Sequence, residues 1–448
     1  MKFPAYPKYK PSGVEWLGDV PEHWEVKRGR FVMQVNPCRG NAAELDPDDE
    51  VSFVPMEAVG VLGGLNLEQT KSISEIGPGY TEFQNGDVVV AKITPCFENG
   101  KGALAADLIN GVAFGTTELH VLRAASALDS RFLFFITISS SYRKTGEAEM
   151  YGAGGQKRVP PEFNKDFRTP LPPIAEQQTI ADFLGQETAR LDTLVAKRQA
   201  LIKKLKEKRT VLISRTVTCG LNPEAKLKPS GIEWLGDIPA HWERLPFTKY
   251  IVDKADYRGK TPEKVTDGIF LVTAKNVRMG FIDYESSQEF VRPEDYDEIM
   301  RRGLPRRGDV LFTTEAPLGN VALVDREDIA LAQRIIRFRM MPSRFSSKFT
   351  LYAMMSDSFQ GQLERLSTGS TAEGLKASKL FSIWLVAPPI PEQIAITKFL
   401  DRETSKIDQM AEKVELAIAR LQEYRTALIT AAVTGKIDVT GQPGNKSK

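Results

Sequence analysis

The sequence predicts an α+β protein in which two mixed α/β domains are separated by two long antiparallel coiled-coil helices, arranged as a pseudo-twofold internal repeat. Three observations lead to this fold class. A 16-residue segment occurs twice, a six-residue proline-rich segment occurs twice, and a stretch of more than 40 residues with helical apolar spacing follows each proline-rich segment. The stretches between the repeats have nearly equal lengths but divergent sequences. A constant frame therefore carries two different domains.

The two repeated segments recur at almost the same separation. Lys10–Glu25 returns as Lys228–Glu243 with 13 of 16 residues identical, at an offset of 218 residues. The segment PPIAEQ at Pro172–Gln177 returns as PPIPEQ at Pro388–Gln393, at an offset of 216 residues. Solenoid repeats have periods of roughly 20–50 residues, far below this value. We interpret the chain as the duplication of one domain together with its connector.

The repeats also place the predicted domain boundaries. A chain of 448 residues exceeds what one hydrophobic core normally supports, so at least two domains are expected. The predicted organisation is a first variable domain at 1–170, a first long helix at 171–220, a second variable domain at 221–386, a second long helix at 387–435 and a C-terminal tail at 436–448.

Composition limits the classes of function. Hydrophobic residues make up 42% and charged residues 26%, as in ordinary soluble globular proteins. No apolar run approaches the 18 or so residues that span a bilayer, and the first residues lack the apolar core of a signal peptide. We therefore expect a cytoplasmic protein without a membrane partner. The net charge is only +2, so any surface that binds nucleic acid must be local.

The chain lacks the residue patterns of a reaction centre. Its three cysteines and three histidines show no zinc-ligand spacing, which argues against a structural metal and a disulfide framework. Gly259–Thr261 resembles the end of a phosphate-binding loop, but Lys254 stands where that loop needs a glycine. We predict that the chain is non-catalytic, with no catalytic, metal-binding or cofactor-binding residues of its own.

Each proline-rich segment starts a predicted helix of about 43 residues. The first runs from Ile174 to about Thr218, and at roughly 1.5 Å per residue it would be about 64 Å long. The preceding diproline suits a helix start, and Gly220 and Gly435 suit the two helix ends. Apolar residues recur in alternating steps of four and three, which is the seam of a coiled coil. The seam positions are Leu184, Thr188, Leu191, Val195, Arg198, Ile202, Leu205, Arg209 and Leu212 in the first copy, and Leu400, Thr404, Ile407, Ala411, Val414, Ile418, Leu421, Arg425 and Leu428 in the second.

A helix this long cannot bury its apolar stripe against one small domain, so its natural partner is the other copy. The connector Gly220–Leu227 is too short to lead back along the helix, which favours antiparallel pairing. Arg209 and Arg425 occupy matching seam positions, where they either extend to solvent or form a buried polar contact that sets the register. Eight basic residues against one glutamate between Lys197 and Arg215 form either a solvated face or an arm over phosphates or an acidic partner.

The two divergent stretches show short β-rich runs and helical segments, as expected for mixed α+β domains. The expected strands lie at 52–55, 86–92 and 118–122 in the first domain and at 269–273, 308–313 and 334–339 in the second. Helical periodicity is present at 130–141 and 346–366. A Gly-Asp-Val turn at Gly86 and Gly308 is a weak sign of common ancestry.

Basic and amide side chains between the expected strands are the candidate DNA contacts. Arginine, lysine, asparagine and glutamine read base edges, and small residues allow backbone N–H groups to approach phosphate. For any single position a solvated surface charge is the alternative, whereas the two loops at 152–158 and 367–376 are the stronger candidates as sets. The candidates are Lys92, Thr94, Lys101, Gly154, Gln156, Lys157 and Arg158 in the first domain, and Lys275, Asn276, Arg278, Arg306, Arg307, Thr313, Ser370, Thr371 and Lys376 in the second.

Taken together, the repeated motifs resemble the specificity subunit of type I restriction–modification systems over essentially the full chain. They are the two copies of Trp-Leu-Gly-Asp-(Val/Ile)-Pro-x-His-Trp, the two Pro-Pro-Ile-x-Glu-Gln helix starts and the two Arg-Thr-x-Leu-Ile-x-x-x-Val-Thr helix ends, Arg209–Thr218 and Arg425–Thr434. The resemblance implies two target-recognition domains that each read one half of an asymmetric bipartite site in double-stranded DNA. It also implies that the paired helices set the length of the spacer.

The resemblance further implies a non-enzymatic scaffold. Two adenine-methyltransferase (M) subunits holding S-adenosylmethionine, and up to two ATP- and Mg²⁺-dependent restriction (R) subunits, would assemble on this chain, with docking expected on the repeated segments and helices. Trp16, Trp24, Trp234 and Trp242 would belong either to those surfaces or to the core of each domain. The alternative function is a two-headed coiled-coil protein-interaction scaffold without DNA binding. Salt dependence separates the two, because phosphate contacts release counterions.

Overall fold

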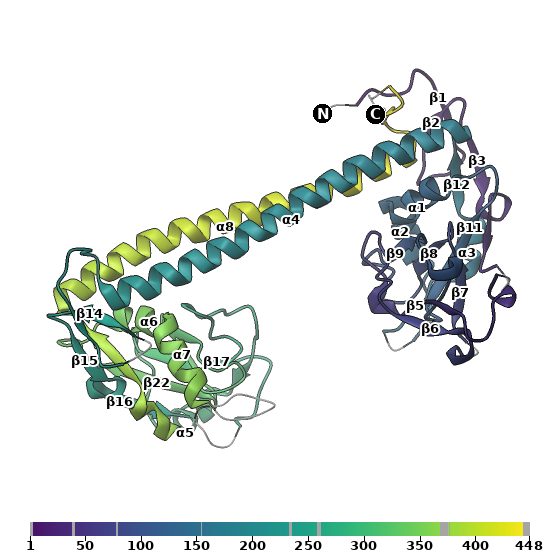
Figure 1. The fold of residues 1–448 in the computed structure, drawn as a ribbon. Helices are drawn as coiled ribbons and strands as arrows, with labels where there is room; N and C mark the ends of the chain where they lie inside the picture. Colours follow the sequence, from purple (N-terminus) through teal and green to yellow (C-terminus); the bar gives the residue numbers. More distant parts are fainter. Residues whose placement is uncertain are drawn as a thin grey trace. The chain divides into compact units, whose positions relative to one another are not determined.

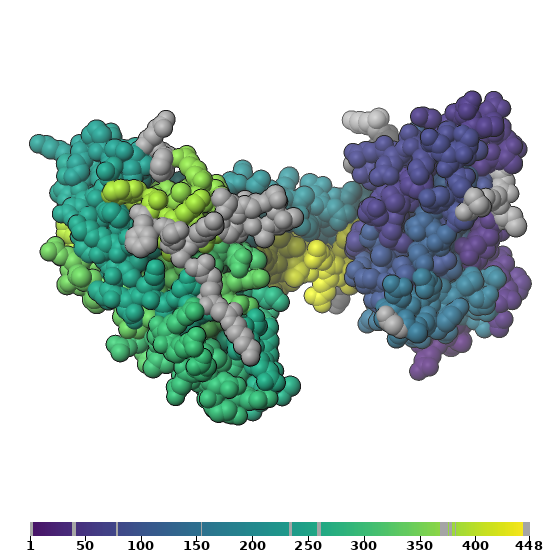
Figure 2. Space-filling view, turned by 90° about the horizontal axis from the view of Figure 1, so that it is seen from below, coloured from purple at the N-terminus to yellow at the C-terminus, as the bar shows by residue number. Residues whose placement is uncertain are grey.

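The computed structural model describes residues 3–37, 41–77, 79–153, 155–232, 235–257, 261–367, 375 and 377–441. The chain divides into two compact units. The first comprises Met1–Arg198 together with Leu416–Lys448, and the second comprises Gln199–Glu415. Figure 2 shows the surfaces of both units, with the variable domain of the first in purple and blue and that of the second in teal and green.

The first unit contains two four-stranded sheets, in the strand orders β6-β5-β10-β7 and β4-β11-β8-β9, and two strand pairs, β1-β2 and β12-β3. Helix α1 packs on the sheet that contains β8, β9 and β11 (Figure 1). The strands are β1 (Tyr9–Pro11), β2 (Asp19–Pro21), β3 (Glu25–Arg28), β4 (Met33–Val35), β5 (Glu50–Val54), β6 (Thr70–Ser72), β7 (Thr81–Gln84), β8 (Val88–Ala91), β9 (Gly102–Leu104), β10 (Val112–Gly115), β11 (Leu119–Ala124) and β12 (Arg168–Leu171). The helices are α1 (Ser130–Ile138), α2 (Ser140–Ala148), α3 (Pro161–Asp166), the first part of α4 (Ile174–Cys219) and the last part of α8 (Ile390–Val433).

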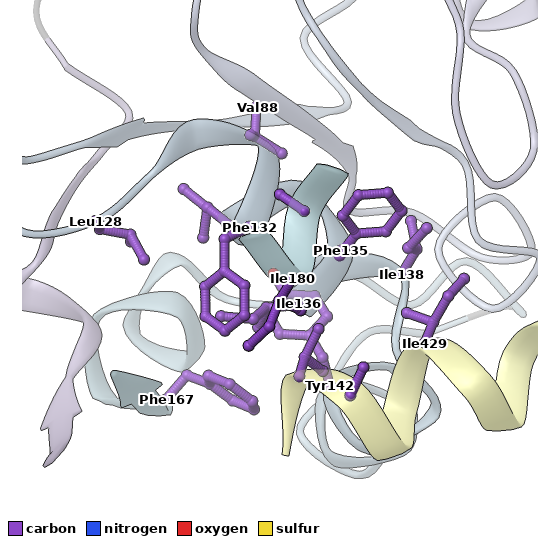
Figure 3. Packing of buried hydrophobic residues seen from close by; sticks show 14 of the residues in the cluster. Val88, Leu128, Phe132, Phe135, Ile136, Ile138, Tyr142, Phe167, Ile180 and Ile429 are labelled. Carbon is purple, nitrogen blue, oxygen red and sulfur yellow. The ribbon is translucent and has the colours of Figure 1, made fainter. Parts of the chain in front are cut away.

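The core of the first unit joins the variable domain to both long helices. Phe132 and Ile136 of α1 are buried together with Ile180 of α4 and Ile429 of α8. Figure 3 shows these side chains converging in one cluster, with Ile429 projecting from the last part of α8. Burying a large apolar side chain contributes about 1.5–3 kcal/mol, so this cluster holds the helix ends firmly against the domain.

The second unit repeats this plan. Its sheets have the orders β16-β22-β19-β20 and β18-β17-β21, its strand pairs are β13-β14 and β15-β23, and α6 packs on β19 and β20. The strands are β13 (Leu227–Pro229), β14 (Asp237–Pro239), β15 (Glu243–Pro246), β16 (Ile251–Asp256), β17 (Ile269–Val272), β18 (Phe290–Val291), β19 (Val310–Thr313), β20 (Val321–Leu323), β21 (Ile329–Leu331), β22 (Ile335–Met340) and β23 (Trp384–Ala387). The helices of the variable domain are α5 (Tyr296–Ile299), α6 (Ser347–Met355) and α7 (Asp357–Leu366).

The predicted fold class is confirmed, and each of the six expected strands has a counterpart among β5, β8, β11, β17, β19 and β22. Each expected helical segment differs, because it consists of two helices. The break is an extended serine, Ser139 in the first unit and Ser356 in the second. Each serine hydroxyl accepts a hydrogen bond from the backbone N–H three residues further along the chain, so it starts the next helix while ending the previous one.

Helices α4 and α8 have 46 and 44 residues and begin directly after their diprolines. Gly220 and Gly435 follow their ends with φ of +76° and +70°, the left-handed conformation expected there. All the predicted seam positions are buried or partly buried. In the first unit Asp192 of α4 pairs with Arg425 of α8, and in the second Arg209 pairs with Asp408.

These ion pairs and the cores show that the pairing is antiparallel within each unit. In the first unit, the part of α4 before Asp192 packs with the part of α8 after Arg425. In the second unit, the part of α4 after Arg209 packs with the part of α8 before Asp408. Both seam arginines therefore form cross-helix polar contacts, and the buried contact of the second alternative raised above is found for Arg425 but not for Arg209. Arg425 is 7% exposed, whereas the Arg209 side chain keeps 26% of its surface exposed.

The glutamate of each proline-rich motif clamps the repeated segment to the start of its long helix. Glu176 accepts hydrogen bonds from Trp24 Nε1 at 2.9 Å and Tyr6 Oη at 2.8 Å, and lies 2.8 Å from His23 Nε2. Its counterpart Glu392 accepts a hydrogen bond from Trp242 Nε1 at 3.0 Å and lies 2.8 Å from His241 Nε2. Trp24 and Trp242 are fully buried, so they belong to the core of each unit.

The neighbouring glutamine performs a second repeated task. Gln177 donates to the carbonyls of Ala127 and Pro172 and accepts from the N–H of Asp129, the residue that caps α1. Gln393 makes the equivalent bonds to Arg344, Pro388 and Ser346. Both amides are completely buried with their hydrogen bonds satisfied. The repeated motif is therefore a joint between the long helix, the frame and the variable domain.

The residues after α8 pack against the first unit. Lys436 Nζ donates to the carbonyl oxygen of Leu17 at 2.8 Å, and Asp438 N donates to that of Pro4. Val439 is buried in the same core as Trp24. The segment that we expected to be a tail is therefore part of the first unit as far as it is described. Trp16 is partly buried and stacks on Phe167 with 5.0 Å between ring centroids, whereas Trp234 lies outside the described residues.

Candidate nucleic-acid interface

Three segments of the first unit meet where β8 ends and β11 begins. The N–H of Lys92 donates to the carbonyl of Glu118 at 2.9 Å, and the N–H of Val159 donates to the carbonyl of Lys92 at 2.8 Å. Thr94 and Lys157 exchange backbone and hydroxyl hydrogen bonds across the same junction. We call the surface formed by 92–94, 118 and 156–158 the first strand-end surface.

Four of the predicted contacts of the first domain lie together on this surface. They are Lys92, Thr94, Lys157 and Arg158, and Gln156 is exposed beside them. Lys101 is held differently, because its Nζ donates to the carbonyl of Met56 at 2.7 Å. Gly154 lies outside the described residues.

An arginine–glutamate pair is the strongest electrostatic feature of the first strand-end surface. Arg158 Nε is 2.9 Å from Glu118 Oε2, and Arg158 Nη2 is 2.7 Å from Glu118 Oε1, in a bidentate arrangement. The hydrogen bond from Arg158 holds the pKa of Glu118 below its usual value of 4.5. The carboxylate is therefore ionised at neutral pH and fixes the arginine in place.

The second unit closes its sheet at the equivalent place. The N–H of Thr314 donates to the carbonyl of Arg334 at 2.9 Å, and the N–H of Leu375 donates to the carbonyl of Thr314 at 3.0 Å. These bonds match those of Lys92, so Arg334 stands where the first unit has Glu118. We call the surface formed by 314–316 and 333–334 the second strand-end surface. The charge at the shared position is reversed, and Arg334 Nε pairs with Glu315 Oε1 at 3.0 Å.

A cavity of about 250 Å³ opens beside Arg334. Besides Arg334 and Ala316, its walls carry the polar side chains of Lys264, Lys275 and Gln333. Lys264 is 2.7 Å from the carboxylate of Glu289, which also lines the cavity, and Gln333 Nε2 donates to Thr261 Oγ1 at 2.7 Å. The second strand-end surface therefore offers donors and acceptors in a recess.

Other predicted contacts of the second domain have different roles in the structure. Asn276 is fully buried, and its amide donates to the carbonyls of Asp283 and Ser287 within its own loop. Thr313 is also fully buried and donates to the carbonyl of Pro317. Neither side chain is placed to read a base edge, because their polar groups are already used inside the protein.

The remaining predictions lie away from the second strand-end surface or outside the described residues. Arg306 and Arg307 are exposed, but they belong to the turn before β19, at the opposite end of that strand from Thr314. Arg278 is ion-paired with Asp283. Ser370, Thr371 and Lys376 lie outside the described residues.

Sequence reasoning did not select Glu118, Arg334, Glu315 or Gln333. The signal available was positional, because Glu118 and Arg334 each begin a predicted β-rich run after the Gly-Asp-Val strand of their domain. That signal becomes visible only when the two copies are aligned by strand pairing, which pairs Leu119 with Ala91 in one unit and Ile335 with Thr313 in the other.

The described residues contain no candidate metal site and no candidate membrane span. No group of three or more histidine, cysteine, aspartate or glutamate side chains among them is placed to hold a metal ion. Their helices include none with the length and apolar content required to cross a membrane.

Comparisons with known proteins find similarity to specificity subunits of type I restriction enzymes. Residues 293–417 match a family model described as "Type I restriction modification DNA specificity domain". The chain is 38% identical over 164 residues to the EcoAI specificity subunit of Escherichia coli, a match that covers 36% of this chain and 27% of that protein. It is 23% identical over 430 residues to the MjaVIII specificity subunit of Methanocaldococcus jannaschii, covering 94% of each chain. The aligned region thus spans about a quarter of the first relative and nearly all of the second.

Solved structures share the fold. One chain from a structure described as the "Structural basis underlying complex assembly and conformational transition of the type I R-M system" matches with a TM-score of 0.70 at 17% identity, covering 92% of this chain and 98% of that one. The HsdS subunit of Thermoanaerobacter tengcongensis matches with a TM-score of 0.51 at 18% identity, covering 93% of this chain and 98% of that one.

Proposed function

We propose that this chain, which belongs to the family of type I restriction–modification specificity subunits, recognises an asymmetric bipartite sequence in double-stranded DNA, one half with each unit. The observation that carries the proposal is the pair of strand-end surfaces. The same sheet corner in each unit bears basic and amide side chains, and the residues at that corner differ between the units. Equivalent placement with different chemistry is expected of two domains that read different sequences.

The two long helices suit a spacer-setting role in this proposal. Each helix contributes its two parts to different units, since the division falls at Arg198 in α4 and at Leu416 in α8. A continuous helix changes its length by a fixed amount per residue, roughly 1.5 Å. We propose that helix length sets the number of unspecified base pairs between the two half-sites.

The chain acts within a type I restriction–modification complex in this proposal, and its repeats supply two equivalent docking surfaces. In the first unit a groove of about 810 Å³ lies between the end of α8 and the start of α2, where Ser140 N donates to Thr430 Oγ1. In the second a groove of about 720 Å³ lies between α4 and the start of α7, where Asp357 N donates to Ser214 Oγ. Repeated grooves suit two copies of one partner, which we propose to be the methyltransferase subunit.

Catalysis and cofactors belong to partner subunits in this proposal. Two methyltransferase subunits would hold S-adenosylmethionine, and up to two restriction subunits would use ATP and Mg²⁺. The described residues of this chain would supply binding and orientation only.

The first test is co-expression of this chain with the methyltransferase subunit encoded beside it, in a host that lacks adenine methylation, followed by single-molecule sequencing of the host DNA. We expect one gapped, asymmetric motif methylated on both strands. The affinity of the purified complex for that motif should fall steeply as salt rises, because each phosphate contact releases about one counterion. Unmethylated DNA together with salt-insensitive binding would instead favour a protein-interaction scaffold.

The second test changes the helices alone. One heptad inserted between Thr193 and Arg209, matched by one heptad at the equivalent place in α8, preserves the seam while lengthening both helices. The spacer of the methylated motif should change and both half-sites should stay the same. A changed half-site would contradict the spacer-setting role.

A further inference from the structure

Each strand-end surface contains one arginine that forms an ion pair with a glutamate. In the first unit Arg158 contacts Glu118 through Nε and Nη2. In the second unit Arg334 contacts Glu315 through Nε. The two arginine side chains remain 42% and 50% exposed, so each contacts its glutamate through one edge and keeps another edge in solvent.

The geometry of the guanidinium group determines what the solvated edge can bind. The donors of an arginine form a rigid planar fork, and the Nη1 edge points away from a partner bound at Nε. Two parallel donors match the O6 and N7 acceptors that guanine presents in the major groove. A fixed arginine loses less side-chain entropy on binding than a free one, which favours tight and specific contact.

The backbone supplies a second observation in the second unit. Arg334 has φ of +73°, in the left-handed region that residues with a Cβ seldom occupy. Such a residue persists only where its surroundings determine its conformation, and it occurs preferentially at functional sites. The bond from Thr314 N to the Arg334 carbonyl holds this conformation at the mouth of the 250 Å³ cavity.

The two arginines arise from different segments around one shared position. Glu118 and Arg334 are equivalent, and the arginine comes from the closing loop in the first unit and from the residue before β22 in the second. The glutamate comes from the residue before β11 in the first unit and from the segment after β19 in the second. The two units therefore form an arginine–glutamate pair at the same sheet corner from different segments.

We propose, resting on the DNA-recognition function proposed above, that Arg158 and Arg334 are specificity-determining residues that each read one guanine, Arg158 in one half-site and Arg334 in the other. The glutamates Glu118 and Glu315 are positioning residues for these arginines. Two consequences follow. Both half-sites contain at least one G·C pair, and loss of either arginine relaxes recognition at one position of one half-site only.

The test uses the complete complex with its methyltransferase subunit and compares Arg158→Lys and Arg334→Lys with the unaltered chain by methylated-motif sequencing. Lysine keeps the charge but cannot form the bidentate contact. We expect each variant to lose discrimination against other bases at one former G·C position by about tenfold or more, with the opposite half-site unchanged. Arg326→Lys is the matched control, because the Arg326 side chain is 45% exposed and paired with Asp328, and both residues lie in the connection between β20 and β21. It should leave the motif unchanged.

The outcomes separate this inference from the function on which it rests. No methylated motif with the unaltered chain would reject the proposed function itself. A gapped motif in which both arginine variants keep full specificity, or a half-site made only of A·T pairs, would overturn the guanine assignment and leave the function standing. If Arg334→Lys fails to assemble, Glu315→Gln replaces it, since loosening the arginine should relax the same position to a smaller extent. Unchanged specificity in Glu315→Gln would then count against the assignment of Arg334.

Discussion

An equivalent aspartate in each variable domain pairs with one arginine in the first domain and with two arginines in the second. In the first, Asp87 of the Gly-Asp-Val turn binds Arg123 of β11 at 2.7 Å through both oxygens. In the second, the equivalent Asp309 binds Arg339 in the same way and also binds the completely buried Arg337 at 3.0 Å.

The added arginine in the second domain has its own partner. Arg337 donates to Asp253 at 2.7 Å, and these two residues stand where the first domain has Val121 and Gln34. One domain therefore has an apolar residue and an amide where the other has an ion pair. A duplicated frame tolerates this difference because replacing a buried ion pair by apolar residues of similar volume is often energetically neutral, whereas breaking one is costly.

The largest effect is expected from removing the shared aspartate. Asp309→Ala leaves Arg337 without solvent and with only Asp253 as a carboxylate partner, so it should destabilise the second unit by about 3–5 kcal/mol. Asp87→Ala leaves Arg123, which is 31% exposed and can hydrate, and should cost about 1–3 kcal/mol. Hydrogen–deuterium exchange of β19 and β22 against β8 and β11 measures the two units separately. Equal losses of protection would contradict the comparison.

A double replacement sharpens the same comparison. Arg337→Val combined with Asp253→Gln recreates the arrangement of the first domain and should cost less than about 1 kcal/mol. Each single change should cost more, because Arg337→Val removes one of the two arginines that Asp253 contacts, and Asp253→Gln removes one of the two carboxylates that Arg337 contacts. The same exchange experiment gives the coupling between the two sites, and additive single effects would show that the pair is not a unit.

The two glutamate clamps should differ by the number of donors that they hold. Glu176 contacts Tyr6, His23 and Trp24, whereas among the described residues Glu392 makes such side-chain contacts with a histidine and a tryptophan alone. A glutamine side chain keeps one acceptor oxygen but places an N–H₂ group against a hydrogen-bond donor. Glu176→Gln should therefore lower the free energy of unfolding by about 1–3 kcal/mol, and Glu392→Gln should lower it by less. Urea unfolding followed by tryptophan fluorescence is a direct measurement. A larger loss in Glu392→Gln would reject this account.

The cross-helix ion pairs predict a smaller difference. Arg425 is 7% exposed, and its Nε lies 3.1 Å from Asp192 Oδ1 without the alignment of a hydrogen bond. Asp192→Ala therefore leaves a nearly buried charge and should cost about 1–3 kcal/mol. Asp408→Ala, whose partner Arg209 is more exposed, should cost less than about 1 kcal/mol. Thermal unfolding of the two variants side by side tests the order.

The smallest effect is expected at the first strand-end surface and depends on pH. The pKa of Glu118 is lowered by Arg158, so the stability from this pair is fully present above the usual pKa of 4.5 and is lost as pH falls through the lowered value. The free energy of unfolding of Glu118→Gln, measured by urea unfolding, should thus be slightly lower than that of the unaltered chain at pH 7, and the two values should converge in acid. A difference in unfolding free energy that grows as pH falls would contradict the stabilising role of the Glu118–Arg158 pair.

Much of this architecture could be predicted because it depends on local patterns. Periodic apolar residues in α4 and α8 predicted two long helices, and the short connector after Gly220 predicted their antiparallel pairing. Diprolines and glycines predicted the helix ends. The predicted helical segment at 130–141 was wrong in one respect, because a serine can cap one helix while ending another, and apolar spacing alone does not reveal the break at Ser139.

The structure brings together some of the predicted contact residues and separates others. Lys92, Thr94, Lys157 and Arg158 come together because the segments at 92–94 and 157–159 bond to each other. Asn276 and Thr313 have side-chain types that often contact DNA, yet both are fully buried in hydrogen bonds of their own loops. Residue type shows what a side chain can donate or accept, and only its surroundings show whether that capacity is already used.

The amino-acid sequence by itself determined the duplication, the two long helices and the frame that joins each helix to its domain, because these features repeat in the chain and follow short-range rules of helix formation. Only the tertiary structure decided which charges meet. The pairing of β8 with β11 and of β19 with β22 places Glu118 and Arg334 at one equivalent position, and each then meets its partner from another segment. Such contacts depend on long-range strand register, which pattern and composition do not specify.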